Sequence, residues 1–461
     1  MGKHIGVLAF PFASHPLTIL GLVRRLASAA PDAKFSFFST ANSNSFLFSA
    51  RSPGGVLGNL KPYDVPDGVP VGHVLSGNPA EGDGLFLKEA PANFKRAMEV
   101  AVAETGRKIS CLVTDALLWF AADMAEEMGV PWVPFWIAGL SALSAHLHTD
   151  VIRQMMGVRG ERNLGFFVKV FYETFMLVLQ TDTSSVVKDL FMTVRNDLPR
   201  LTWRNSFREL GFYPSLMLHK MGLTLPRATA IVANSFEELD PVVATHLKSK
   251  LPKLLCVAPS ALTSSPDELN SDVNGCLSWL DKQKAKSVAY ISFGSMLAPS
   301  PDEHVALAET LQATGVAFLW SIKDNLKKYL PEGFLERTSG NGKVVPWAPQ
   351  IRVLAHPSVG VHITHGGWNS VMESIAGEVP MICRPFWADN TLNSRAIEDV
   401  WGIGVGVPGG VLTKNGLKVA LEQVLGQQGR MTEKIGVLKK LWTRPLSQMG
   451  AQLRISVLCR R

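Results

Sequence analysis

The chain has 461 residues, 46% hydrophobic and 18% charged, a balance that excludes an intrinsically disordered protein. Its net charge is +7, but the Lys and Arg residues are scattered without an aromatic-interleaved basic stripe, so no nucleic-acid partner is expected. Five widely spaced cysteines form no CxxC pair, and no run of eighteen apolar residues predicts a transmembrane helix. We therefore expect a cytoplasmic monomer, long enough for two or three domain cores.

Short apolar strands alternate with helical stretches from the N-terminus onward. The expected strands of this first series are 4–10, 35–40, 109–116, 131–136 and 228–236. Such βαβ alternation predicts a parallel, doubly wound sheet. The following stretch 250–275 is rich in Pro, Ser and Asn, which is typical of a linker.

A second βα series follows this stretch. Its expected strands are 287–295, 317–322, 342–347, 359–365 and 379–386. The predicted fold class is therefore α/β, with two Rossmann-like domains facing across a cleft at the carboxyl ends of their strands. The glycine-rich run 402–410 has Val407 where a dinucleotide fingerprint needs its third Gly, and it follows a helix, which disfavours a nicotinamide cofactor.

The segment HITHGGWNSVMES, residues 362–374, indicates an anion site. An apolar strand ends at His365, two glycines make a tight turn, and Asn369 and Ser370 stand at the start of a helix, where both are also common N-cap residues. Glycines let backbone N–H groups approach an anion, and the helix N-terminus adds partial positive charge. Ser295, in the earlier turn ISFGSM, can face the same ligand.

Residues 347–390, WAPQIRVLAHPSVGVHITHGGWNSVMESIAGEVPMICRPFWADN, resemble the signature box of the family 1 UDP-sugar glycosyltransferases of plant secondary metabolism. Further stretches, such as LPRATAIVANSFEELDP and LPEGFLERTSG, are similar to the flavonoid 3-O-glycosyltransferases. The resemblance implies a GT-B fold with an acceptor-binding domain at 1–248, a UDP-sugar-binding domain at 249–440, and a C-terminal helix at 441–461 that packs back on the first domain. Gly366 stands where the family commonly has Cys.

The resemblance also implies roles for residues of the donor site. The residues expected at the uracil and ribose are Trp347, Ala348, Gln350 and Glu373. Those expected at the diphosphate are Ser295, His365, Gly367, Asn369 and Ser370. Those expected at the sugar are Ile137, Trp368, Asp389 and Asn390. An indole face suits a planar base, and a carboxylate suits a vicinal diol.

Catalysis is expected from the first half of the chain. His15 lies in the loop after the first strand, and Asp115 ends a later strand. The resemblance places both at the family's catalytic dyad, in which the aspartate orients the histidine and the histidine acts as general base. We expect direct displacement with inversion, without a cofactor or metal, since the chain contains no Asp-x-Asp sequence.

The acceptor is expected to be a flavonol, bound by apolar and aromatic residues. The residues expected to contact it are Phe10, Phe12, Leu117, Trp136, His146 and Trp387, together with the stretch 166–179. Core packing explains any one of these residues equally well. Ala80 stands where some relatives have a Gln that reaches the flavonoid, so the preferred ring hydroxylation stays open.

Two departures from glucose-using relatives bear on the donor sugar. Asn390 replaces a Gln, and Ile137 replaces a Thr whose hydroxyl is directed to the sugar 6-OH. An apolar side chain leaves that hydroxyl unpaired but accepts the methyl group of a 6-deoxy sugar. The sequence thus favours UDP-rhamnose, making the protein a flavonol 3-O-rhamnosyltransferase. The alternatives are UDP-glucose or a UDP-pentose as donor, a nicotinamide oxidoreductase, and an inactive ligand-binding protein.

Overall fold

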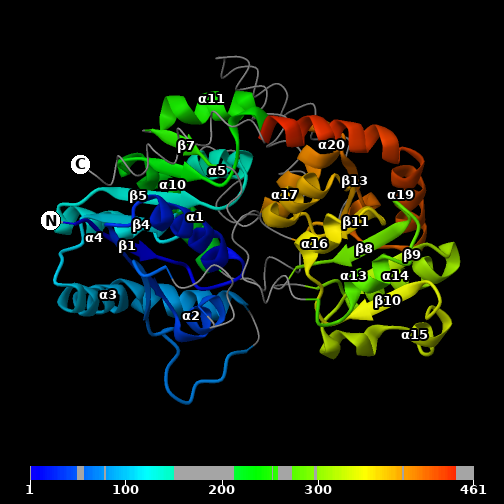
Figure 1. Ribbon diagram of the computed structural model, residues 1–461, viewed down its shortest axis with the longest axis horizontal. Coiled ribbons are helices and arrows are strands. Elements are labelled where there is room, and N and C mark those ends of the chain that lie inside the picture. Colours follow the sequence, from blue (N-terminus) through cyan, green and yellow to red (C-terminus); the bar gives the residue numbers. More distant parts are fainter. Residues whose placement is uncertain are drawn as a thin grey trace. The chain divides into compact units, whose positions relative to one another are not determined.

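The computed structural model describes residues 2–48, 57–76, 79–149, 212–251, 253–257, 272–294, 298–386 and 389–442. These residues form two compact units, one within Met1–Ser264 and the other within Ser265–Arg444 (Figure 1). Four sequence-based predictions lie outside the described residues: the stretch 166–179, Ser295, Trp387, and the C-terminal segment beyond residue 442.

The first unit is built on a seven-stranded parallel sheet with the order β3-β2-β1-β4-β5-β6-β7. Its strands are β1 (His4–Leu8), β2 (Lys34–Ser39), β3 (Leu60–Asp64), β4 (Cys111–Asp115), β5 (Trp132–Trp136), β6 (Ile231–Ala233) and β7 (Leu254–Cys256). Its helices are α1 (His15–Ala29), α2 (Ala41–Leu47), α3 (Pro79–Thr105), α4 (Ala121–Met128), α5 (Leu140–Leu147), α10 (Phe212–Thr224) and α11 (Pro241–Lys250), with short 3-10 turns η1 (Leu225–Arg227) and η2 (Glu237–Leu239). The predicted βαβ alternation is confirmed.

The buried strand residues explain why this sheet forms. β1 and β4 are buried along their whole length, as near-continuous apolar strands of a parallel sheet covered on both faces should be. β7 departs from the sequence prediction, because it lies inside the stretch 250–275 that was expected to be a linker. Its parallel pairing with β6 carries the first sheet beyond residue 248, where the domain boundary was placed.

The second unit contains a six-stranded parallel sheet with the order β10-β9-β8-β11-β12-β13. Its strands are β8 (Val288–Ser292), β9 (Ala317–Ser321), β10 (Gly342–Val345), β11 (Val359–Thr364), β12 (Met381–Cys383) and β13 (Gly404–Gly406). Its helices are α13 (Cys276–Leu280), α14 (Pro301–Thr314), α15 (Phe334–Arg337), α16 (Gln350–Leu354), α17 (Trp368–Gly377), α18 (Asp389–Arg395), α19 (Lys414–Gly426) and α20 (Gln428–Trp442), with shorter turns η4 (Asp324–Tyr329), η5 (Ala396–Val400) and η6 (Pro408–Gly410). The glycine-rich run 402–410 thus forms an edge strand and a turn.

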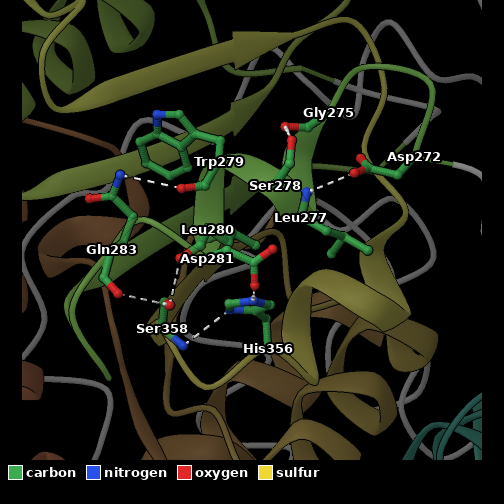
Figure 2. Close-up of polar contacts among 10 residues, drawn as sticks. All are labelled: Asp272, Gly275, Leu277, Ser278, Trp279, Leu280, Asp281, Gln283, His356 and Ser358. Carbon is green, nitrogen blue, oxygen red and sulfur yellow. Dashed lines mark hydrogen bonds and ion pairs between the residues drawn. The ribbon is translucent and has the colours of Figure 1, made fainter.

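A polar cluster ties the start of the second unit to the strand that leads into the predicted donor site (Figure 2). Ser358, just before β11, donates its hydroxyl to the carbonyl oxygen of Leu280 at 2.8 Å, and His356 lies 3.2 Å from Asp281. Asp272 caps α13 by accepting the backbone N–H of Leu277 at 2.9 Å. These contacts hold α13 against the residues just before β11, the strand that ends at the predicted diphosphate turn.

Candidate active site

The strand order brings His15 and Asp115 together although they are 100 residues apart. β1 and β4 are adjacent and parallel, with Leu8 paired to Thr114, so the segments that follow both strands lie at the same edge of the sheet. His15 is the first residue of α1, and Asp115 is the last residue of β4. Ala13, in the connecting loop, has a φ of 52°, a strained conformation for a residue with a side chain, and it lets the chain turn into α1.

The pair has the geometry of an oriented general base. The Nδ1 atom of His15 lies 2.7 Å from the Oδ2 atom of Asp115, whose other oxygen accepts the backbone N–H of Leu117 at 2.9 Å. Because the carboxylate can only accept, the proton of a neutral imidazole resides on Nδ1, and Nε2 is left as the base. The side chain of Asp115 is 1% exposed and that of His15 is 19% exposed, so only the histidine can reach a substrate.

Three phenylalanines pack beside His15. The ring of Phe10 meets the imidazole edge-on at 5.2 Å between centroids, and Phe12 meets Phe10 at 5.2 Å. Phe86, on α3, contacts both of these rings at 5.7–6.0 Å. Phe10 and Phe12 were predicted from the sequence but Phe86 was not, because no local pattern shows that α3 packs against the loop after β1.

Asp83 is a second carboxylate near His15, and no motif in the sequence pointed to it. It lies one turn before Phe86 on α3, next to Gly82, whose α-carbon faces the ring of Phe12. Burial raises the pKa of Asp83 to about 6, and the charge of nearby His15 works against this rise. The surroundings of His15 therefore combine apolar rings with an acidic group.

The remaining residues predicted to bind the acceptor are largely enclosed. Leu117 is buried, and Trp136 is buried with its indole N–H donated to the carbonyl oxygen of Gly139 at 2.9 Å. His146 packs edge-on against Trp136 at 5.5 Å, and burial lowers its pKa to about 4, so its ring is neutral at pH 7. Ile137, predicted to face the sugar, belongs to the hydrophobic core of the first unit and is 9% exposed.

The predicted diphosphate turn follows β11 directly. Gly366 has a φ of 77°, which favours glycine, and Gly367 is the N-cap of α17 without a side-chain capping bond. The alternative reading of Asn369 and Ser370 as N-caps is therefore wrong, since both lie inside the first helical turn. The N-cap position thus offers no side chain to the first N–H groups of α17, which suits this helix end to an anion.

The ring of His365 packs directly against the backbone of Gly367 and Gly294. A β-carbon at Gly367 would come within 2.3 Å of its ring, and one at Gly294 within 2.9 Å, so both positions need glycine. Within the described residues the buried Nδ1 atom of His365 has no hydrogen-bond partner. Burial lowers the pKa of His365 to about 4, so it would meet a diphosphate as a neutral N–H donor at pH 7.

A chain of hydrogen bonds links the predicted ribose residues. Tyr290, on β8, donates its hydroxyl to the Oε1 atom of Gln350 at 3.0 Å. The Nε2 atom of Gln350 donates to Ser370 at 2.9 Å and to Glu373 at 2.5 Å. Burial raises the pKa of Glu373 to about 7, with the Gln350 bond opposing the rise. The structure thus brings Gln350, Ser370 and Glu373 together, and adds Tyr290, which no sequence motif pointed to.

Trp347 and Ala348 lie between β10 and α16. The Trp347 side chain is 45% exposed, unlike the buried tryptophan that is the more common case, and Ala348 is buried in the core. The amide of Asn274 donates to the carbonyl oxygen of Trp347 at 2.7 Å and holds this loop. An exposed indole with a fixed backbone leaves a flat face for a planar base.

The predicted sugar residues begin α18. Asp389 is its first residue, and Asn390 is 6% exposed with its Nδ2 atom 3.5 Å from the Oδ1 atom of Asp389. Asn393, one turn later, donates to the Oδ2 atom of Asp389 at 2.9 Å. Trp368 is buried, and its indole packs towards Trp401 at 6.5 Å.

Neither a metal cluster nor a membrane span is found in the described part of the chain. In these residues no three His, Cys, Asp or Glu side chains are gathered as metal ligands. Among the same residues no helix has the length and apolar character needed to cross a membrane.

The chain is similar in sequence and in structure to known glycosyltransferases. The UDP-glucoronosyl and UDP-glucosyl transferase family matches residues 267–443. The flavonol 3-O-glucosyltransferase F3GT2 of Actinidia chinensis var. chinensis is 49% identical, over 97% of this chain and 94% of the relative. The anthocyanidin 3-O-galactosyltransferase F3GT1 of the same plant is 48% identical, over 97% and 94%. The crystal structure of a UDP-glucose:anthocyanidin 3-O-glucosyltransferase in complex with UDP superposes with a TM-score of 0.84 at 35% identity, covering 100% of this chain and 99% of that chain.

Proposed function

Because the chain belongs to the UDP-glucoronosyl and UDP-glucosyl transferase family, we propose that it transfers a sugar from a UDP-sugar to the 3-hydroxyl of a flavonol or anthocyanidin. The observation that carries the proposal is the 2.7 Å contact between His15 and Asp115 at the carboxyl end of the first sheet. Relatives that cover almost the whole chain and act on flavonols or anthocyanidins support the acceptor class.

The proposed mechanism is a direct displacement. Nε2 of His15 takes the proton of the acceptor hydroxyl while that oxygen forms a bond to the anomeric carbon of the sugar. The bond between this carbon and the diphosphate breaks, and UDP leaves with the electron pair, so the configuration inverts. Asp115 stabilises the imidazolium that forms. The N-terminus of α17 and the neutral His365 ring would stabilise the negative charge on the leaving diphosphate.

For the donor we propose UDP-glucose or a related UDP-hexose rather than UDP-rhamnose. The relatives named for their sugar are glucosyl- and galactosyltransferases, which does not support the rhamnose expectation. That expectation also depended on Ile137 facing the sugar, whereas its side chain packs into the core of the first unit. Ile137 is only 9% exposed, so it offers little apolar surface to a methyl group at carbon six.

The test is a donor panel. Purified protein is incubated with quercetin or cyanidin and with UDP-glucose, UDP-galactose, UDP-rhamnose or UDP-xylose. The products are separated by liquid chromatography, and NMR determines which hydroxyl carries the sugar. We expect the 3-O-hexoside to form faster than the product of any other donor. Faster transfer from UDP-rhamnose would reverse the donor proposal. No glycoside from any donor would refute the function, and oxidation of NADH in its place would favour the oxidoreductase.

Two minor parts of the proposal concern the state of the protein. We propose that it acts as a monomer in the cytoplasm. Size-exclusion chromatography with light scattering and cell fractionation would test these two statements separately.

A further inference from the structure

One side chain, Asn393, joins the diphosphate turn to the predicted sugar-binding carboxylate. Its Nδ2 atom donates to the carbonyl oxygen of Gly366 at 2.9 Å and to the Oδ2 atom of Asp389 at 2.9 Å. An amide nitrogen carries two hydrogens, so these two bonds use its whole donor capacity. Asn393 is 5% exposed; its bond to Gly366 is buried, and its bond to Asp389 is partly buried.

The two segments that Asn393 joins also touch through their backbones. A β-carbon at Gly366 would lie 3.3 Å from the carbonyl oxygen of Asn390, tighter than ordinary van der Waals contact. No side chain at position 366 therefore separates the turn from the start of α18. The bonds of Asn393 therefore oppose a shift of α18 relative to the turn, at a place where the glycine offers no side chain to interlock.

The other end of the loop before α18 is held independently. Arg384, which follows β12, forms two hydrogen bonds with Glu303 at 2.7 and 2.8 Å, and its guanidinium stacks on Phe386 at 4.2 Å. Glu303 also accepts the backbone N–H of Leu412 at 3.0 Å. With Arg384 anchored in this way, the bond from Asn393 to Asp389 ties the carboxylate at the start of α18 to the diphosphate turn.

We propose that Asn393 is a positioning residue that sets the distance between the diphosphate turn and the carboxylate of Asp389. It would thereby align the sugar of the bound donor without contacting UDP. This inference rests on the proposed function, because Asp389 must hold the sugar for its position to matter. Misplacement of a reacting group by about 1 Å costs on the order of 100-fold in rate, so the effect should appear in transfer more than in UDP binding.

The experiment compares UDP with UDP-glucose. In Asn393→Ala, and in Asn393→Asp, where a second carboxylate would face Asp389, we expect kcat/KM for the donor to fall about 10- to 100-fold, through a lower kcat and through weaker binding of UDP-glucose. The Kd for UDP, measured by calorimetry, should stay within about threefold of the wild type. Asn341→Ala is the matched control, since that side chain also donates to a backbone carbonyl of the same unit, at 3.1 Å from Gly315, and should change neither quantity.

A double-mutant cycle separates positioning from a general structural role. If Asn393 acts through Asp389, then Asp389→Ala with Asn393→Ala should be no slower than Asp389→Ala alone. Additive losses, a parallel loss of UDP affinity and transfer, or unchanged kinetics would each overturn the proposal. Stabilisation by UDP in thermal unfolding verifies that each variant is folded.

The proposed function can fail on its own in this design. If the wild-type protein makes no glycoside, the function is refuted. The positioning role is then judged by the ratio of the UDP and UDP-glucose affinities. Asn393→Ala should then weaken the binding of UDP-glucose and leave that of UDP unchanged, and an equal effect on both ligands refutes the positioning role.

Discussion

Replacing Glu373 by Gln should stabilise the protein and weaken its binding of UDP. Burial raises the pKa of this carboxyl from 4.5 to about 7. A carboxyl whose pKa is raised in the folded state contributes stability below its unfolded pKa, and this contribution is lost as the pH rises through the folded pKa. The wild-type protein should thus lose stability between about pH 4.5 and pH 7, whereas the glutamine that replaces Glu373 does not ionise.

The size of the effect follows from the two pKa values. The difference between 4.5 and about 7 corresponds to roughly 3 kcal/mol above pH 7. Since the Glu373 residue is partly exposed, solvent reduces this to about 1–3 kcal/mol, or a rise in Tm of roughly 2–10 °C for a unit of this size. The amide oxygen of a glutamine can still accept the hydrogen bond from Gln350, so no donor is left unpaired.

The assay is thermal unfolding at pH 5, 7 and 8, with UDP titrations at the same pH values. The gain should be largest at pH 8 and small at pH 5. UDP affinity of the wild type should rise towards pH 7, because ribose hydroxyls bind best to the ionised carboxylate, and should be weaker and flat with pH in the variant. Glu378→Gln is the control of opposite sign, since Lys439 at 2.8 Å lowers the pKa of Glu378. A Glu373→Gln variant that is less stable at pH 8 would refute the reasoning.

Three further predictions follow from the described contacts. His15→Ala should lower kcat by about 10²–10⁴-fold while UDP affinity is retained, and near-normal transfer would remove it as the base. Arg384→Met should lower the free energy of unfolding by about 3–5 kcal/mol in denaturant titrations, because the charge of Glu303 is left buried without its ion-pair partner. Adding Glu303→Leu should recover part of the loss, and no recovery would contradict a stabilising role of this ion pair. Ile137→Thr should cost about 1–3 kcal/mol by burying a hydroxyl in the core yet leave the ratio of UDP-glucose to UDP-rhamnose use unchanged, and a changed ratio would show that this side chain reaches the sugar.

Burial shifts the pKa values of Glu373 and His365 in opposite directions, and each shift favours the neutral form. The pKa of the acid is raised to about 7 and that of the imidazole is lowered to about 4, both by burial. Both changes disfavour charge in the protein without ligand, so the proposed donor site carries less charge than its residue types suggest. A ligand that offers hydroxyls to Glu373 would favour the ionised form of its carboxyl, so donor binding near pH 7 should release protons to the solvent, while His365 binds the diphosphate as a neutral donor.

Much of the fold could be predicted from the sequence because its signals are local. Alternation of apolar strands with helical stretches predicts parallel sheets wherever it occurs, and a glycine pair between a strand and a helix is a local feature of a turn. β3, β7 and β13 escaped prediction for the same reason. β3 contains a proline and charged residues, and β7 and β13 have three residues each, so pairing with a neighbour and not composition makes each of them a strand.

What the sequence by itself determined is the two βα series, the turn at His365 to Gly367, and the candidate residues along it. Only the tertiary structure decided which of these residues meet. The strand order places β1 beside β4, and therefore His15 on Asp115, across 100 residues. Packing placed Ile137 in a core, Tyr290 on Gln350, and Asn393 between two segments of the site. Such contacts join residues that are far apart in the chain, so they depend on sheet order and helix packing, which no local pattern encodes.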